Sequence, residues 1–242
     1  MPQEKTEAVV LRGVDFSETS RVVTFLCPVR GRLACIAKGA RRKNSPLAAA
    51  LDTFNRVELV YYWKDGRGVQ NLAEVSVLDR FAGVKRDLER SAYAAFPLEL
   101  AYRVAHENEP SAPLYEALVR GLNGLATWTG LARTHACWQV LRLLEAAGFA
   151  PVLDHCTGCG GPLGDAAAFS LSGGTRCRAC GGGLPVEGAV IASMRALLCE
   201  CDVCPTDALD VSEGVFRVLR RYAAYQLETD FRSLRVLDEI VG

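Results

Sequence analysis

Four cysteines in two matched pairs constrain this chain more than any other feature. Cys156 and Cys159 form one Cys-x2-Cys motif, and Cys177 and Cys180 form another. A turn of this spacing directs two thiolates toward one point, so two such turns can surround a single metal ion with sulfur. Four thiolates make a closed tetrahedral site that suits structural Zn2+, because no coordination position stays open for catalysis.

Glycine follows each pair, at Gly160 and Gly181. Because glycine takes a positive φ without steric cost, the backbone after each pair can turn and direct N–H groups at the sulfurs. We therefore expect one structural Zn2+ ion and no chemistry at the metal. Two disulfides, or unpaired thiols that cluster, are the alternatives. His155 precedes the first pair and is an alternative ligand, although four cysteines leave it no necessary role.

The other six of the ten cysteines are less informative. Cys199, Cys201 and Cys204 form a dense group that suggests a second soft-metal or redox site. A closed site needs a fourth ligand, so we expect no metal there, and the sequence assigns the group no other role. The remaining three lie in apolar surroundings and are most simply small core residues: Cys27, Cys35 and Cys137.

Length and charge limit the possible classes of protein. A chain of 242 residues can form one large domain or two to three small ones. Its formal net charge is zero, so any nucleic-acid binding must come from a local patch rather than from a globally basic surface. The polar first residues and the lack of an apolar run of about eighteen residues predict no signal peptide and no membrane span. We therefore expect a cytoplasmic protein, in which reduced thiols favour metal binding over disulfides.

Residues 1–80 predict a small β-barrel. Residues 45–51 predict a short helix, with Ser45 as N-cap and Pro46 at the first helical position. Five strands with a helix after the third are typical of a closed OB-type barrel. The predicted strands, which alternate or carry short apolar runs, are 7–11, 21–26, 32–38, 57–63 and 69–79.

The rest of the chain predicts helices. Pro97 is expected to kink the first of them or to split it in two. The predicted helices are 84–107, 114–127, 134–147, 185–201 and 212–229, with Gly148 ending the third and Ser212 capping the last. The predicted fold is thus α+β and multidomain: an OB-type barrel over 1–80, a helical domain in two parts over 81–155 and 184–242, and a four-cysteine zinc module inserted over 156–183.

Positive charge is concentrated in one part of the predicted barrel. Residues 30–43 contain six basic side chains and no acidic one. Residues 38–43 follow a strand and include a glycine, so we expect them to form a loop, called the basic loop below. Clustered Lys and Arg bind phosphates and release counterions, although a solvated charged loop is the alternative. The candidate DNA-binding residues are Lys38, Arg41, Arg42 and Lys43, extended by Arg30 and Arg32, which we expect to share a face.

The sequence contains none of the common catalytic motifs. No P-loop, HExxH motif, nucleophile elbow or dinucleotide-binding glycine motif occurs in the sequence, so we predict that the protein is not an enzyme.

Five aromatic residues of the predicted barrel could stack on bases, although core positions explain them equally well: Phe25, Phe54, Tyr61, Tyr62 and Trp63.

Several segments together resemble the bacterial RecO family of recombination mediators. The basic segment Lys38-Gly39-Ala40-Arg41-Arg42 and the inserted four-cysteine module, in this order, are the most specific part of the resemblance. The group at Cys199, Cys201 and Cys204 departs from the family pattern. The resemblance also rests on Ala8–Leu11, Phe16–Arg21, Ser45-Pro46, Leu141–Leu144, Gly148–Pro151, Phe169-Ser170, Gly173-Gly174 and Phe231–Leu237.

The resemblance implies an N-terminal OB barrel, a helical domain and a zinc module. It also implies a nucleoid-associated protein that binds single- and double-stranded DNA and anneals complementary strands. Such a protein binds the acidic C-terminal tail of single-strand-binding protein and, with RecR, helps to load the RecA recombinase. Two other classes stay open from the residues alone. One is a zinc-stabilised protein-interaction scaffold with incidental DNA contact, and the other is a zinc hydrolase or nuclease.

Overall fold

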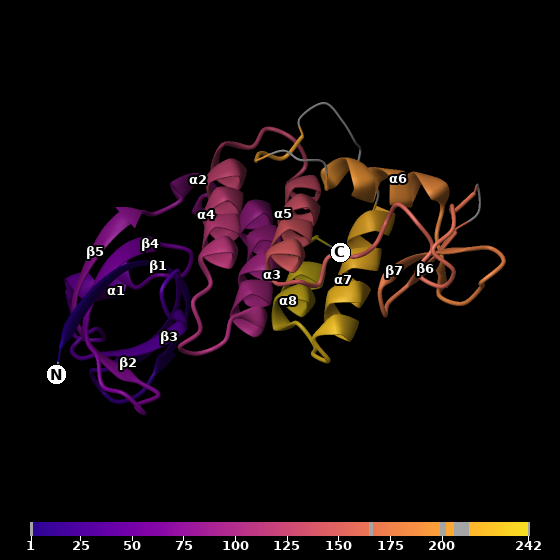
Figure 1. Cartoon of the computed structure of the whole chain (residues 1–242). Coiled ribbons are helices and arrows are strands. Elements are labelled where there is room, and N and C mark those ends of the chain that lie inside the picture. Colours follow the sequence, from indigo (N-terminus) through magenta and orange to yellow (C-terminus); the bar gives the residue numbers. More distant parts are fainter. Residues whose placement is uncertain (1, 165–166, 199–201, 206–212, 242) are drawn as a thin grey trace. The chain divides into compact units, whose positions relative to one another are not determined.

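Figure 1 shows the computed structural model of the chain, which describes residues 2–164, 167–198, 202–205 and 213–241. The chain divides into two compact units. The first contains Met1–Arg86 and Ala101–Ala126, and the second contains Asp87–Leu100 and Thr127–Gly242. Strands dominate the first part of the chain and helices the later part, which confirms the predicted α+β multidomain class.

A five-stranded β-barrel lies in the first unit (Figure 1). Its strands close in the order β1-β2-β3-β5-β4, with β1 pairing with both β2 and β4. Neighbouring strands are antiparallel except β3 and β5, whose parallel pairing is short, from Cys35↔Gln70 to Ile36↔Asn71. The strands are β1 (Gln3–Asp15), β2 (Arg21–Cys27), β3 (Gly31–Ala37), β4 (Arg56–Tyr62) and β5 (Gln70–Asp79).

Strand order and the position of the first helix confirm the predicted OB-type barrel. Helix α1 (Pro46–Ala50) follows β3, as predicted. Ser45 has the extended backbone of an N-cap, but its side chain makes no capping hydrogen bond. The end of the helix is supported by Asn55, whose buried amide group donates hydrogen bonds to the carbonyls of Ala49 and Ala50. These carbonyls would otherwise lack a partner inside the helix.

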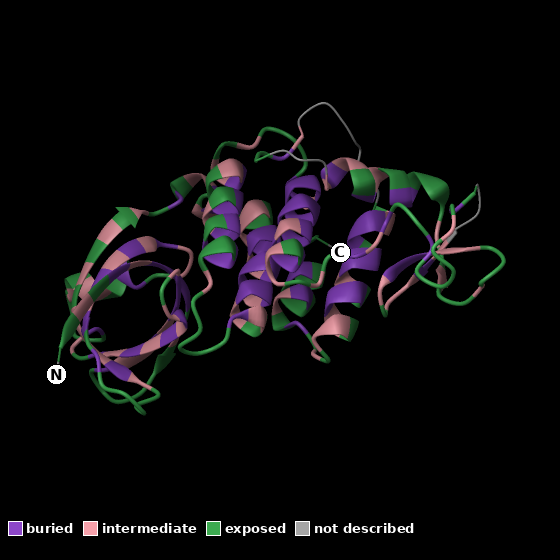
Figure 2. Ribbon diagram, in the orientation of Figure 1, coloured by how far each residue is buried: buried purple, intermediate pink, exposed green. Residues whose placement is uncertain are grey.

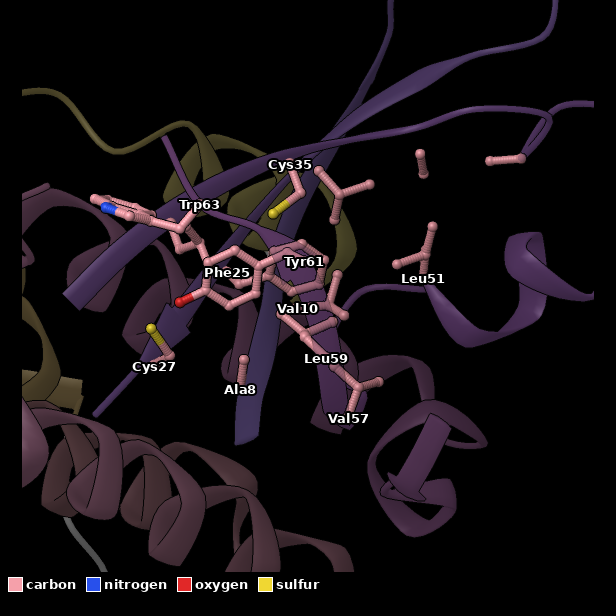
Figure 3. Close-up of a cluster of buried hydrophobic side chains, with 14 residues drawn as sticks. Ala8, Val10, Phe25, Cys27, Cys35, Leu51, Val57, Leu59, Tyr61 and Trp63 are labelled. Carbon is pink, nitrogen blue, oxygen red and sulfur yellow. The ribbon is translucent and has the colours of Figure 1, made fainter. Parts of the chain in front are cut away.

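Alternate side chains of the strands fill the barrel interior (Figure 3). Phe25 and Tyr61 are fully buried and Trp63 nearly so, which makes these three aromatic residues part of the core and removes them from the candidates for base stacking. Cys27 and Cys35 belong to the same core, as predicted. Burial raises the pKa of the Cys27 thiol to about 11, so this cysteine stays protonated at neutral pH.

Helices make up most of the described chain after the barrel. Helix α3 (Leu88–Val104) contains Pro97 and continues past it, so the predicted split at this proline does not occur. The break lies earlier, at Asp87, whose carboxylate caps α3 by accepting a hydrogen bond from the backbone N–H of Arg90. The other helices are α2 (Ala82–Lys85), α4 (Ala112–Thr127), α5 (Ala132–Ala146), α6 (Gly188–Leu197), α7 (Glu213–Gln226) and α8 (Arg232–Val241).

Helix α8 has no counterpart among the predicted helices. Its signal was the three-residue spacing of Phe231, Leu234 and Leu237, which are all buried. Phe231 packs edge-to-face on Phe96 of α3, with ring centroids 5.0 Å apart. Figure 2 shows the corresponding buried faces on α5 and α7 of the same unit. The predicted cap at Ser212 lies outside the described residues.

No helix in the described part of the chain has both the length and the apolar character needed to cross a lipid bilayer.

Helix α5 ends before Gly148, which takes a φ of +79°, as predicted for the residue that terminates the helix.

Helix α5 also buries an uncharged histidine. His135 is fully buried, and neither ring nitrogen has a hydrogen-bond partner among the described residues. Its ring packs edge-on against Trp128 and Trp138, with centroid distances of 5.4 and 5.2 Å. Burial lowers the pKa of His135 to about 4, because the apolar site disfavours the charged ring.

Protonation of His135 is therefore expected to oppose folding. Between about pH 6.5 and pH 4 the unfolded chain binds a proton that the folded chain does not. The free energy of unfolding therefore decreases by on the order of 3 kcal/mol as the pH is lowered through this window. His135→Leu removes this titration and should flatten the pH dependence of urea unfolding across that window. His106→Leu, at an exposed histidine, should leave the wild-type pH profile in place. A wild-type profile for His135→Leu would contradict the assignment.

Candidate metal centre and nucleic-acid interface

The four paired cysteines meet at one point. Their sulfur atoms all lie within 4.8 Å of one another, and the sulfurs of Cys159 and Cys177, one from each pair, are 3.8 Å apart. Sulfurs bound to one ion at about 2.3 Å form a tetrahedron with edges of about 3.8 Å, whereas a disulfide requires about 2.05 Å. None of the described cysteines is in a disulfide. The group has the spacing of a site that could hold one metal ion.

Matched backbone turns support the two pairs. The N–H of Gly160 donates to the carbonyl of Cys156 at 2.8 Å, and the N–H of Gly181 donates to that of Cys177 at 3.2 Å. Both glycines take a positive φ, +72° and +56°, as predicted. Backbone N–H groups of Cys177 and Cys159 lower the pKa of the Cys156 thiol to about 6, with the Cys177 nitrogen 3.2 Å from the sulfur. These N–H groups favour the thiolate, the form that binds metals.

The second cysteine pair begins at the end of a small sheet, which joins it to the helices of the second unit. The sheet contains β6 (Ala167–Ser170), β7 (Gly174–Cys177) and β8 (Leu184–Pro185) in the order β7-β6-β8. Figure 1 labels β6 and β7. Phe169 of β6 is fully buried and packs edge-to-face on Tyr222 of α7, with centroids 5.5 Å apart. In chain order the module falls between α5 and α6, which confirms that it is an insertion among helices.

The other candidate ligands that the structure describes do not join this cluster. His155 is exposed, and its Nδ1 lies 2.9 Å from the carboxylate of Asp154. Within the described part of the chain, the group that could hold a metal contains the four paired cysteines and not His155. Cys204 is buried, whereas Cys199 and Cys201 lie outside the described residues.

Strand register places the basic loop next to the tip of the β1–β2 hairpin. Asp15 at the end of β1 pairs with Arg21 at the start of β2, and Arg21 pairs with Ala37 at the end of β3. The basic loop begins at Lys38, directly after β3. It therefore starts at the same end of the barrel as the hairpin tip, residues 16–20.

Arg41 ties the basic loop to the hairpin tip. Its backbone N–H donates to the carbonyl of Thr19 at 3.1 Å, and its guanidinium donates to the carbonyl of Ser17 at 2.6 Å. The guanidinium also pairs with Asp15 at 3.1 Å. Arg41 is thus partly neutralised, and its contacts fix the position of the loop.

Three cations of the basic loop are free to bind an anion: Lys38, Arg42 and Lys43. All three are exposed, and their side chains have no ion pair or hydrogen bond with another described residue. Gly39 takes a φ of +76°, which lets the chain reverse directly after the strand. Hydrated cations grouped on one loop can attract an anion without first breaking an internal ion pair.

Arg30 and Arg32 are engaged with different neighbours. Arg30 precedes β3, and its guanidinium bonds both carboxylate oxygens of Glu4, the shorter distance being 2.7 Å. It also lies 4.0 Å from the ring centroid of Trp63. Arg32 donates to the carbonyl of Tyr102 at 3.1 Å and lies over the same residue's ring at 4.9 Å. These contacts show that both arginines support the fold of the first unit.

Two family models together match most of the chain. The model described as "Recombination protein O N terminal" matches residues 1–81, and the one described as "Recombination protein O C terminal" matches residues 85–235. The chain is 33% identical to the DNA repair protein RecO of Exiguobacterium sibiricum, over 99% of this chain and 98% of that protein. It is 32% identical to the DNA repair protein RecO of a Roseiflexus species, over 98% and 85%. It is 34% identical to that of Anaeromyxobacter dehalogenans, over 76% and 73%.

Fold and site define an OB-barrel protein with a helical region that carries a four-cysteine module. The chain belongs to the recombination protein O (RecO) family, as the two family models and the similar relatives show. The resemblance inferred from the sequence is confirmed.

The contacts of Arg30 predict a structural role that a loop cation lacks. Arg30→Ala removes the pairing with Glu4 and the stacking on Trp63, and should lower the free energy of unfolding by about 1–2 kcal/mol. Arg42→Ala makes the same charge change at an exposed side chain, and should stay within about 0.5 kcal/mol of the wild type. Chemical unfolding of the full-length variants measures both. Equal stability of the two variants would show that the Arg30 contacts contribute nothing net.

Proposed function

We propose that this protein is a non-enzymatic DNA-binding mediator of recombination in DNA repair. It binds single- and double-stranded DNA and anneals complementary strands. With RecR, it helps to load RecA onto DNA coated by single-strand-binding protein, whose acidic C-terminal tail it binds. It acts in the cytoplasm, at the nucleoid. Membership of the RecO family supports the proposal, and the grouping of Lys38, Arg42 and Lys43 on one exposed loop is the observation that carries it.

The basic loop is proposed as the phosphate-binding element. Lys38, Arg42 and Lys43 contact phosphates, and each contact releases condensed counterions from the DNA. Arg41 contributes mainly by holding the loop against the hairpin tip, since its guanidinium already pairs with Asp15. Arg30 and Arg32 lie at the opposite end of β3 from the basic loop, about 20 Å along the strand, and keep their partners in the fold, so in this proposal they contact a more distant part of a bound strand.

Annealing needs no catalytic group in this proposal. A strand held through its phosphates keeps its bases free to pair, and positive charge lowers the repulsion between two strands that approach each other. The rate gain comes from raising the local concentration of the complementary strand.

The four-cysteine module is proposed to hold one structural Zn2+ through Cys156, Cys159, Cys177 and Cys180. Sulfur spacing near that of a tetrahedron and backbone N–H groups directed at Cys156 support this choice. We propose residues 156–183 as the zinc module, residues 1–80 as the DNA-binding barrel, and residues 81–155 and 184–242 as the two parts of the helical domain.

Removing the three available loop cations should weaken DNA binding and its salt dependence together. For the variant Lys38→Ala/Arg42→Ala/Lys43→Ala we expect the slope of log K against log salt for single-stranded oligonucleotides to fall by about 2, since each phosphate contact contributes about 0.7. Fluorescence anisotropy over a salt series measures this slope. The matched control is Lys64→Ala/Arg67→Ala/Arg86→Ala, which removes three exposed cations elsewhere in the same unit. Unchanged slopes for the loop variant would refute the assignment.

Metal content tests the cysteine module. We expect one equivalent of zinc per chain by elemental analysis, and loss of the metal and of the module's fold in Cys177→Ser, because three thiolates no longer close the site. Cys27→Ala removes a core thiol of the barrel and should keep the metal at wild-type stoichiometry. A folded wild-type protein that lacks metal and carries its paired cysteines as disulfides would overturn the zinc assignment. Two zinc ions per chain would instead revive a metal-dependent hydrolase or nuclease.

A further inference from the structure

We propose that Phe16 is a base-stacking residue of the nucleic-acid interface and that it contacts unpaired bases of single-stranded DNA. This inference rests on the proposed function. It adds a residue that contributes to the binding of single-stranded DNA and not to the binding of intact duplex. The ligand chemistry is a nucleobase face presented next to a phosphate backbone.

Exposure makes Phe16 unusual among the phenylalanine and tryptophan residues that the structure describes. Its side chain is 67% exposed, whereas every other Phe and Trp in the described residues is buried or intermediate. A single exposed apolar side chain is common on protein surfaces and does not by itself indicate a site. The position of Phe16 relative to the available cations is the second, independent observation.

Two contacts of Arg41 fix Phe16 beside the basic loop. Arg41 pairs with the side chain of Asp15 and donates to the backbone carbonyl of Ser17, and Phe16 is the residue between them. The N–H of Arg41 also bonds the carbonyl of Thr19 in the same hairpin tip. The backbone that carries the Phe16 ring is therefore bound directly to the loop that carries the three unpaired cations.

The hairpin tip is also ordered by its own hydrogen bonds. The N–H groups of Phe16 and Ser17 donate to the carbonyl of Ser20, at 3.1 and 3.3 Å, and the N–H of Ser20 donates to the Ser17 hydroxyl at 3.1 Å. A ring on an ordered turn loses little conformational freedom when it stacks on a base, so more of the stacking free energy appears as affinity.

An exposed ring next to a group of cations fits single-stranded DNA better than other occupants. The cations attract the backbone, and the ring offers a face to a base that has left its stack. Apart from the terminal pairs, bases in a duplex are stacked on both sides and present no free face. An acidic protein segment would pair with the cations but would show no preference for unpaired bases, so the duplex and abasic comparisons below separate it from single-stranded DNA.

Phe16→Ala should weaken binding of a single-stranded oligonucleotide by about tenfold and leave blunt duplex binding within about twofold. The salt slope should stay that of the wild type, since no phosphate contact is removed. Phe16→Trp should keep or raise the affinity, whereas Phe16→Leu, which is apolar but has no ring, should behave like Phe16→Ala. Tyr225→Ala is the matched control, because Tyr225 is an aromatic residue with 55% exposure in helix α7, outside the barrel.

An oligonucleotide with abasic sites supplies a second readout. We expect the wild type to bind it less well than the intact strand, and Phe16→Ala to bind both equally. Thermal unfolding confirms that each variant is folded before binding is compared. If the wild type binds with its usual salt slope and Phe16→Ala binds single strands equally well, the stacking role is wrong and the proposed function stands. If the wild type binds no DNA at all, the proposed function itself fails.

Discussion

The pairing of β2 with both β1 and β3 is the constraint on which the proposed interface depends. It brings Asp15, Arg21 and Ala37 side by side, so the β1–β2 turn and the loop after β3 must leave the barrel at the same end. A shift of one residue in either pairing would turn the alternating side chains of the strand to the opposite face and expose core residues such as Phe25. Burial of the barrel core thus fixes the register, and the register fixes where the cations lie.

Ion pairs then divide the cations of this region by role. In the sequence, Arg30, Arg32 and Arg41 look equivalent to Lys38, Arg42 and Lys43, because charge and chain position are all that a sequence reports. Partners in the fold separate them: Arg30 has Glu4, Arg32 has Tyr102, and Arg41 has Asp15. Glu4 and Asp15 lie far from these arginines in the sequence, so no local pattern could predict the pairing. Tertiary contacts of this kind are what a single sequence does not reveal.

Local signals, in contrast, predicted much of the fold. Short apolar runs and the period-two alternation of residues 57–63 identified the strands. The spacing of the cysteine pairs with their glycines predicted both the cluster and the positive φ values at Gly160 and Gly181. Pro97 shows the limit of such signals, since α3 continues through it. Phe16 shows another limit, because nothing in its local sequence separates this exposed aromatic side chain from the aromatic side chains that fill the core.

The four-cysteine module needs its ligand cluster because it has little core of its own. Residues 156–183 are rich in glycine, and the module's β-sheet is made of strands only two to four residues long. One buried aromatic residue, Phe169, contacts Tyr222 of α7 and anchors the sheet to a helix. Apolar burial on this scale cannot offset the conformational entropy of so many glycines, so cross-linking through a metal would supply the missing stability. Such a module would organise structure, and recognition of DNA is proposed to lie instead at the end of the barrel that carries the basic loop.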